Sequence, residues 1–115
     1  MATPNTQITI QHVPVNMYET EGAMVIVAPL PGVQAEDIEV RVSGGTVSID
    51  AAMRSEAPNK NYVLHEWHYG PYHREVDLPD GFGAYLSASY GNGHVAVSVA
   101  RGEPSTEPIT ITPSR

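Results

Sequence analysis

The densest group of side chains that could do chemistry lies past the middle of the chain, which reads His65-Glu66-Trp67-His68 and then continues to His73. Helical zinc motifs place two histidines four residues apart on one face. His65 and His68 are three residues apart in a predicted strand, so their side chains point to opposite faces. We therefore expect solvated strand histidines and no metal site, with a pH-sensitive interface as the alternative.

Motifs for catalysis are missing from the sequence. No serine lies in a Gly-x-Ser-x-Gly elbow, and no glycine-rich phosphate loop precedes a helix. Cysteine is absent, which excludes disulfides and thiolate zinc sites. The acidic pair Glu36-Asp37 falls in a predicted turn, where solvated charge is the ordinary explanation. We expect no enzyme, no catalytic residue and no cofactor.

Charge and hydropathy exclude further classes of partner. The formal net charge is −7, from 13 acidic and 6 basic residues, which repels phosphate backbones, so we expect no nucleic acid partner. No apolar run approaches the roughly 18 residues that span a bilayer, so we expect no membrane partner. The first residues have neither the basic start nor the apolar core of a signal peptide, and we expect a cytoplasmic protein.

Strand patterns recur about every ten residues, with turn residues such as Gly44-Gly45 and Gly91-Asn92-Gly93 between them. No window shows helical periodicity without an interrupting glycine or proline. The predicted strands span residues 23–28, 38–42, 46–50, 62–69, 72–78, 85–90 and 95–99. The pattern predicts an all-β, immunoglobulin-like β-sandwich with flexible termini.

The predicted organisation has three parts. Residues 1–12 form a short flexible N-terminal arm, residues 13–100 the β-sandwich, and residues 101–115 a flexible C-terminal extension. Each arm holds one apolar island, Ile8-Thr9-Ile10 and Ile109-Thr110-Ile111, whose isoleucines point the same way in an extended chain. Between two strands, polar residues 51–61 are long for a hairpin connection and contain Pro58.

Five segments, in this order, resemble the small heat-shock proteins built on the α-crystallin domain, in its bacterial and plant-like branch. They are residues 15–20, Ala28-Pro29-Leu30-Pro31-Gly32-Val33 with Glu36-Asp37-Ile38, Tyr69-Gly70-Pro71-Tyr72 with Arg74, Leu78 and Pro79, Ala88-Ser89-Tyr90-Gly91-Asn92-Gly93-His94-Val95, and Ile109-Thr110-Ile111. Each segment alone is a weak signal, and the ordered set covers residues 13–111.

The resemblance implies a β-sandwich of seven to nine strands, and a homodimer in which a small strand from the long loop joins the partner's sheet. It places the dimerisation residues on this loop and on the strand after it: Met53, Arg54, Ser55, Glu56 and Arg74. Arg74 resembles the family's arginine at the dimer contact, and an ordinary surface ion pair is the alternative.

An aromatic group, Trp67, Tyr69 and Tyr72, lies around the turn at Gly70-Pro71. This group either forms a platform for a partner or packs in the core and the turn in the ordinary way.

The resemblance also implies that Ile109 and Ile111 dock in a groove of a neighbouring dimer. The groove residues expected here are Val40 and Val42 on one side, and Val76 and Leu78 on the other. The alternative is a tail strand that packs on its own domain. Because the N-terminal arm is about 12 residues long and has no aromatic residue, we expect dimers or small oligomers and not large shells.

The function that the resemblance implies is that of an ATP-independent stress chaperone, a holdase that binds unfolding client proteins and prevents their aggregation. The alternative is a non-chaperone adaptor module on a sandwich like that of the CS-domain co-chaperones, which lack a groove-docking isoleucine pair. A third reading, a small β-sandwich enzyme or lectin, requires a polar pocket that the sequence does not indicate.

Overall fold

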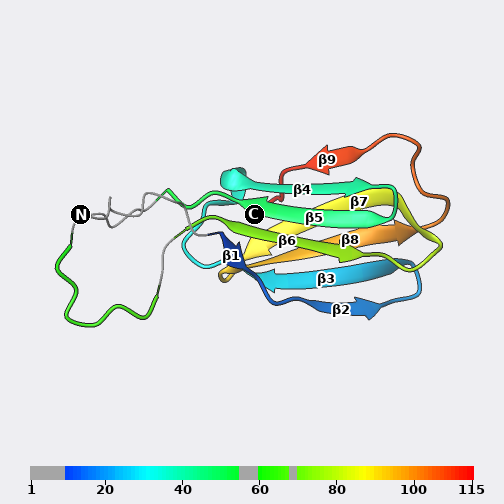
Figure 1. Cartoon of the computed structure of the whole chain (residues 1–115). Coiled ribbons are helices and arrows are strands. Elements are labelled where there is room, and N and C mark those ends of the chain that lie inside the picture. The colour runs from blue at the N-terminus through cyan, green and yellow to red at the C-terminus, as the bar shows by residue number, and fades with distance from the viewer. Residues whose placement is uncertain (1–9, 55–59, 68–69) are drawn as a thin grey trace, which may run out of the picture.

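The computed structural model describes residues 10–54, 60–67 and 70–115, which form a sandwich of two β-sheets (Figure 1). The first sheet, here sheet A, has the strand order β1-β6-β5-β4-β9, and the second, sheet B, has the order β2-β3-β8-β7. Sheet A contains β1 (Gln11–His12), β6 (Tyr72–Asp77), β5 (Thr46–Ala51), β4 (Ile38–Ser43) and β9 (Ile109–Ile111). Sheet B contains β2 (Asn16–Glu19), β3 (Ala23–Pro29), β8 (His94–Arg101) and β7 (Phe82–Gly91). A 3-10 turn, η1 (Ala35–Asp37), precedes β4.

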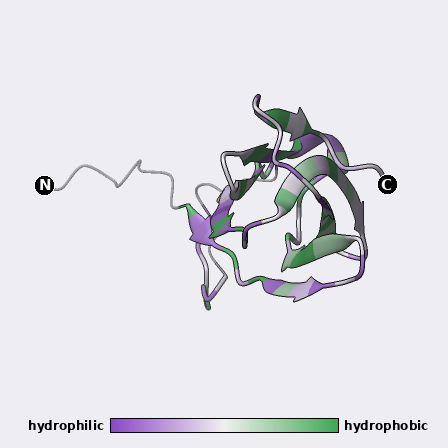
Figure 2. Cartoon of the chain, turned by 90° about the vertical axis from the view of Figure 1, so that its right-hand side faces the viewer, coloured by the Kyte–Doolittle hydropathy of each residue, from purple (hydrophilic) through white to green (hydrophobic). Residues whose placement is uncertain are grey.

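Alternation of apolar side chains explains how the two sheets pack. Ile38, Val40 and Val42 on β4 are buried, as are Val95, Val97 and Val99 on β8, while the residues between them point outward. Each Val or Ile that is fully buried contributes about 1.5–3 kcal/mol to folding. Buried apolar residues from both sheets form one core cluster, and a view along the strands shows the two sheets facing each other (Figure 2). The all-β sandwich expected from the sequence is confirmed.

The chain crosses from β3 of sheet B to β4 of sheet A through Leu30-Pro31-Gly32, and a tyrosine from each sheet holds this crossing. The Tyr90 hydroxyl on β7 donates to the Leu30 carbonyl at 2.7 Å, and the Tyr72 hydroxyl on β6 donates to the Pro31 carbonyl at 2.8 Å. Burial raises the pKa of both phenols, so they remain proton donors at neutral pH. Gly32 has a φ of 86°, where other residues are strained, and a Cβ on it would lie 3.1 Å from Met53 Cε.

One expected strand is wrong. The sequence predicts a strand over residues 62–69, but residues 60–67 form an exposed loop, and residues 68 and 69 lie outside the described part of the chain. Within the segment predicted as a C-terminal extension, Ile109–Ile111 forms an outer strand of sheet A. Within the described ranges, no helix has the length and apolar composition needed to cross a membrane.

The tyrosine contacts at the crossing give a testable prediction. Tyr90→Phe removes one hydrogen bond and leaves the buried Leu30 carbonyl unpaired, so it should lower the free energy of unfolding by about 1 kcal/mol in urea titration. Tyr85→Phe is the control, because Tyr85 lies on the same strand with 66% of its surface exposed. Equal stability of the two variants would contradict the role given to the Tyr90 hydroxyl.

Candidate functional site

The C-terminal tail lies on the free edge of β4. β9 pairs with it antiparallel, with Ile109 opposite Val42, Thr110 opposite Arg41 and Ile111 opposite Val40. Ile109 and Ile111 are half-buried against the core, while Thr110 points outward. Backbone hydrogen bonds therefore hold this segment in an extended form, and the two isoleucines supply its apolar contact.

Beyond β9 the tail crosses to sheet B. The Tyr90 N–H donates to the Ser114 carbonyl at 2.7 Å, and the Ser114 N–H donates to the Ala88 carbonyl at 3.0 Å. Pro113, between these contacts and β9, is buried. The tail therefore closes the side of the sandwich between β4 and β7. We call the surface that receives it, residues 40–42 of β4 and residues 88–90 of β7, the tail seat.

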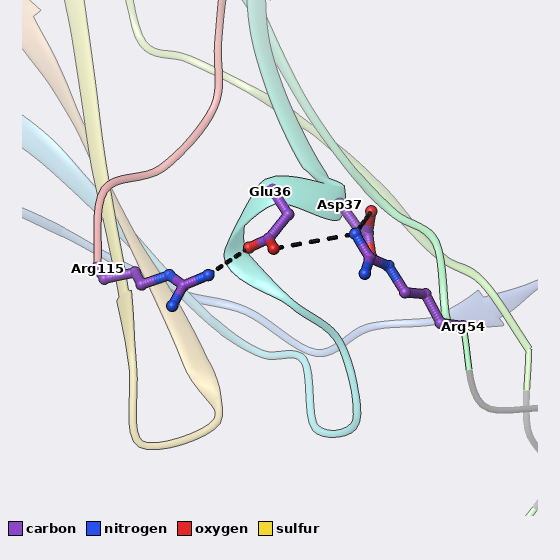
Figure 3. Close-up of polar contacts among 4 residues, drawn as sticks. All are labelled: Glu36, Asp37, Arg54 and Arg115. Atoms are coloured by element: carbon purple, nitrogen blue, oxygen red, sulfur yellow. Dashed lines mark hydrogen bonds and ion pairs between the residues drawn. The ribbon is translucent and has the colours of Figure 1, made fainter.

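An ion-pair cluster lies where the tail ends and the long β5–β6 loop begins (Figure 3). Arg115 Nη2 donates to Glu36 Oε1 at 2.7 Å, and Arg54 Nη2 lies 3.9 Å from Glu36 Oε2. Arg54 also donates twice to Asp37, at 2.5 and 3.1 Å, which raises the pKa of its guanidinium. Two hydrogen bonds lower the pKa of Glu36. The larger effect comes from the backbone amide of Glu36 itself, and the next largest from Arg115. Glu36 and Asp37 therefore have specific partners, although a solvated turn was expected.

The structure does not bring together the two expected walls of the groove. Val40 and Val42 lie beside the tail, but Val76 is on β6, and β5 separates β6 from β4. Leu78 follows β6, and its N–H donates to the Gly45 carbonyl at 2.8 Å. The strand that faces the tail across the sandwich is β7 of sheet B. The tail lies on its own domain, which is the alternative to docking on a neighbouring dimer.

The loop between β5 and β6, residues 52–71, contains the expected dimerisation residues only in part. Met53 packs against the core and Arg54 binds Asp37, while Ser55 and Glu56 lie outside the described residues. Among the described residues of the loop, the most exposed large apolar side chains are Val63 and Leu64. Sheet B meanwhile ends in β2, all four residues of which are exposed and whose outer edge pairs with no described strand.

Arg74, on β6, forms its described side-chain hydrogen bonds with the segment around β1, and its place at a dimer contact stays a prediction. Its Nη1 donates to the Val13 carbonyl at 2.9 Å and lies 3.1 Å from His12 Nε2. Among the described residues, no carboxylate lies within ion-pair distance of this guanidinium. Arg74 of β6 therefore holds β1 and the residue that follows it against β6.

His73 belongs to a row of titratable side chains across the outer face of sheet A. Strand pairing aligns Glu39 of β4 with Asp50 of β5, Asp50 with His73 of β6, and His73 with His12 of β1. His73 Nδ1 lies 2.5 Å from Asp50 Oδ1, and its Nε2 lies 3.5 Å from Glu75 Oε2. The hydrogen bond to Asp50 is the largest cause that raises the pKa of His73, and burial acts in the opposite direction.

The sequence reasoning missed several residues of these sites: Ser114 and Arg115 of the tail, Ala88 of β7, and Val63 and Leu64 of the loop. A signal for the tail was present, because Ile109, Ile111 and Pro113 follow an i, i+2, i+4 pattern that continues one face. The contacts of Arg115 and Ser114 have no such signal, because they join residues that are distant in the sequence.

Comparison with known proteins places this sandwich in a family. The profile of the Hsp20/alpha crystallin family matches residues 16–112. A relative named small heat shock protein C2 from Rickettsia felis is 27% identical over 88 residues, which cover 74% of this chain and 57% of the relative. The spore protein SP21 of Stigmatella aurantiaca is 30% identical over 96 residues, which cover 81% of this chain and 56% of that protein. The chain thus spans slightly more than half the length of these two curated relatives.

A solved structure supports the same assignment. The hspA protein of Xanthomonas axonopodis superimposes with a TM-score of 0.74 at 27% identity, and the match covers 84% of this chain and all of that one. The fold and the matching profile define an α-crystallin domain. The chain belongs to the Hsp20/alpha crystallin family, whose small heat shock proteins are chaperones. The family resemblance expected from the sequence is confirmed.

The His73 contact gives a pH-dependent prediction. Since the folded state raises its pKa above the ordinary 6.5, protonated His73 should stabilise the fold fully below pH 6.5, and this stabilisation should disappear as the pH rises through the raised pKa. Asp50→Asn should return the pKa of His73 toward its ordinary value, measured by NMR titration of the imidazole. It should cost less than about 1 kcal/mol at acidic pH, because the pair is exposed, and nothing at alkaline pH. A pKa of His73 that Asp50→Asn leaves unchanged would contradict this assignment.

Proposed function

We propose that this protein is an ATP-independent holdase that binds unfolding polypeptides and prevents their aggregation. Membership of the Hsp20/alpha crystallin family carries the proposal. The structure supports it, because the tail seat holds an extended peptide through its backbone and two apolar side chains. Unfolded clients present both features, and neither needs nucleotide chemistry. A non-enzymatic role and a cytoplasmic location are parts of the same proposal.

Binding at such a seat is reversible. Burying two isoleucines contributes about 3–6 kcal/mol, and ordering the peptide and losing its translational freedom offset much of it. Backbone pairing does not depend on the side chains, so the seat discriminates weakly among extended segments that place apolar residues at i and i+2. Weak discrimination and rapid release suit a protein that holds many unfolding clients.

We further propose a homodimer in which the β5–β6 loop of one chain adds to β2 of its partner. The exposed side chains of Val63 and Leu64 provide the apolar contact on the loop, and Met17 and Tyr18 provide it on β2. The outer backbone edge of β2, which pairs with no described strand, is the natural acceptor for an added strand. β1, an outer strand of sheet A, has only 2 residues, so its edge offers little backbone for an added strand.

Chaperone activity is tested by heating a model client without ATP and following light scattering. Equimolar protein should suppress aggregation, since apolar client segments bind at the seat and other edges. Ile109→Ser with Ile111→Ser should free the seat and increase suppression, whereas Thr110→Ser, which changes only an outward side chain, should match the original protein. Aggregation that equimolar protein leaves unchanged would exclude the holdase function and favour an adaptor module.

The dimer contact is tested by measuring mass in solution. Val63→Asp with Leu64→Asp should convert a dimer to a monomer, because charge on the loop opposes burial against β2. Tyr85→Asp is the matched control, since it adds charge at an exposed apolar residue on another strand. A dimer that survives the loop substitutions would place the interface elsewhere.

A further inference from the structure

The two outer faces of the sandwich differ in charge. The outward side chains of β4, β5 and β6 in sheet A include Glu39, Asp50, Glu75 and Asp77, beside Arg41 and His73. Along the four described strands of sheet B, the outward positions alternate with the buried ones, and none of them is Asp, Glu, Lys or Arg. The chain has a formal net charge of −7, so the outer face of sheet B is a surface where charge does not oppose contact with another copy.

Side-chain size changes across this uncharged face. Strand pairing places Tyr18 of β2 and Val25 of β3 in one row with Ser98 of β8 and Ser87 of β7. In the next row, Val27 of β3 lies beside two small residues, Ala96 and Ser89. The larger side chains therefore lie over β2 and β3, and the smaller ones lie over β8 and β7.

The smaller side chains leave an open depression of about 320 Å³ over β7 and β8. Its lining includes Ser87, Ser89, Ala96 and Ser98, with Val25 on the side of β3. The Tyr18 side chain, beyond β3, is 53% exposed. The face thus has a bulky half and a hollow half, which meet between β3 and β8.

We propose that the outer face of sheet B packs against the same face of a second copy, about a two-fold axis that runs parallel to the strands between β3 and β8. This axis sets the bulky half of each copy over the hollow half of the other. Val25 then lies over the second copy's Ser98, and Val27 over the second copy's Ala96. Large side chains that face small ones let two sheets interdigitate, and the two-fold axis makes the surface complementary to itself.

The size of the face limits the strength of this contact. Three strand spacings by about six residue rises give roughly 14 by 20 Å, or about 300 Å² of flat area on each copy. Stable interfaces bury about 800 Å² on each partner. The contact is therefore weak and depends on protein concentration. It uses neither the β4 edge nor the β2 edge, so it does not rest on client binding or on the proposed dimer.

A charge placed on the face tests the proposal. Ser98→Asp puts a carboxylate at the centre of the contact, where packing would bury it without a partner, so association should weaken by roughly tenfold or more. Ser48→Asp is the matched control, because Ser48 is also a half-buried, outward serine in the middle of a sheet, here sheet A. Light scattering over a concentration series should show the average mass rising for the original protein and for Ser48→Asp, and staying flat for Ser98→Asp.

Cross-linking tests the pairing itself, because the chain contains no cysteine. A size-tagged chain with Val25→Cys is mixed with an untagged chain with Ser98→Cys and oxidised. Disulfides can join two packed sheets, so the tagged and untagged chains should become linked to each other, in preference to links between like chains. Ser48→Cys in place of Ser98→Cys should link poorly. This measurement introduces no charge, so it remains decisive if Ser98→Asp fails to fold.

Each result bears on the proposal. The same concentration dependence for Ser98→Asp and Ser48→Asp, or equal cross-linking at residues 98 and 48, would overturn it. Preferential linking of Val25→Cys to itself would overturn the placement of the bulky half over the hollow half. Added salt should raise the average mass, since screening weakens repulsion between copies of net charge −7, and a fall in mass would indicate an ion-paired contact elsewhere.

A client assay separates this contact from the holdase proposal. Ser98→Asp should leave the suppression of client aggregation unchanged. A loss of suppression with no change in average mass would assign the face to clients and overturn the contact between copies. The mass and cross-linking measurements contain no client, so their failure is distinct from failure of the holdase proposal.

Discussion

The backbone edge of β4 that β5 leaves open, and that the tail covers, is the constraint on which the arrangement of this protein depends. An edge strand presents a row of N–H and C=O groups that its own sheet cannot satisfy. β5 pairs with one side of β4, and the tail pairs with the other through Ile109–Ile111. The apolar side chains beneath this edge need the same cover, because Val40 and Val42 point into the sandwich. One short segment therefore satisfies the backbone and shields the core.

Covering this edge also joins the two sheets. The tail leaves β4, places Pro113 in a buried position and reaches β7 through Ser114. On the other sides of the sandwich, the Tyr72 and Tyr90 hydroxyls hold the crossing segment at Pro31 and Leu30. β2, whose outer edge pairs with no described strand, is the edge to which the proposed dimer adds a strand. The proposed self-assembly and client capture therefore rest on the same backbone chemistry.

Much of the fold could be predicted because its signals are local. Period-two alternation located the buried faces of β4 and β8, and Gly91-Asn92-Gly93 located the hairpin between β7 and β8. The wrong prediction of a strand over residues 62–67 has a physical reason. Val63 and Leu64 have the composition of a strand, but they are exposed and pair with no described strand, and composition does not reveal whether a neighbouring strand is present.

The sequence by itself determined the class of fold, the turns, the family and the presence of two Ile-Thr-Ile segments, because spacing along the chain encodes each of these features. The tertiary structure alone decided that the tail occupies its own domain, and that β7 and not β6 faces it. It also decided that Arg115 meets Glu36, and that Arg74 binds the Val13 carbonyl. These contacts join residues that are distant in sequence, so they depend on strand order, which side-chain periodicity does not encode.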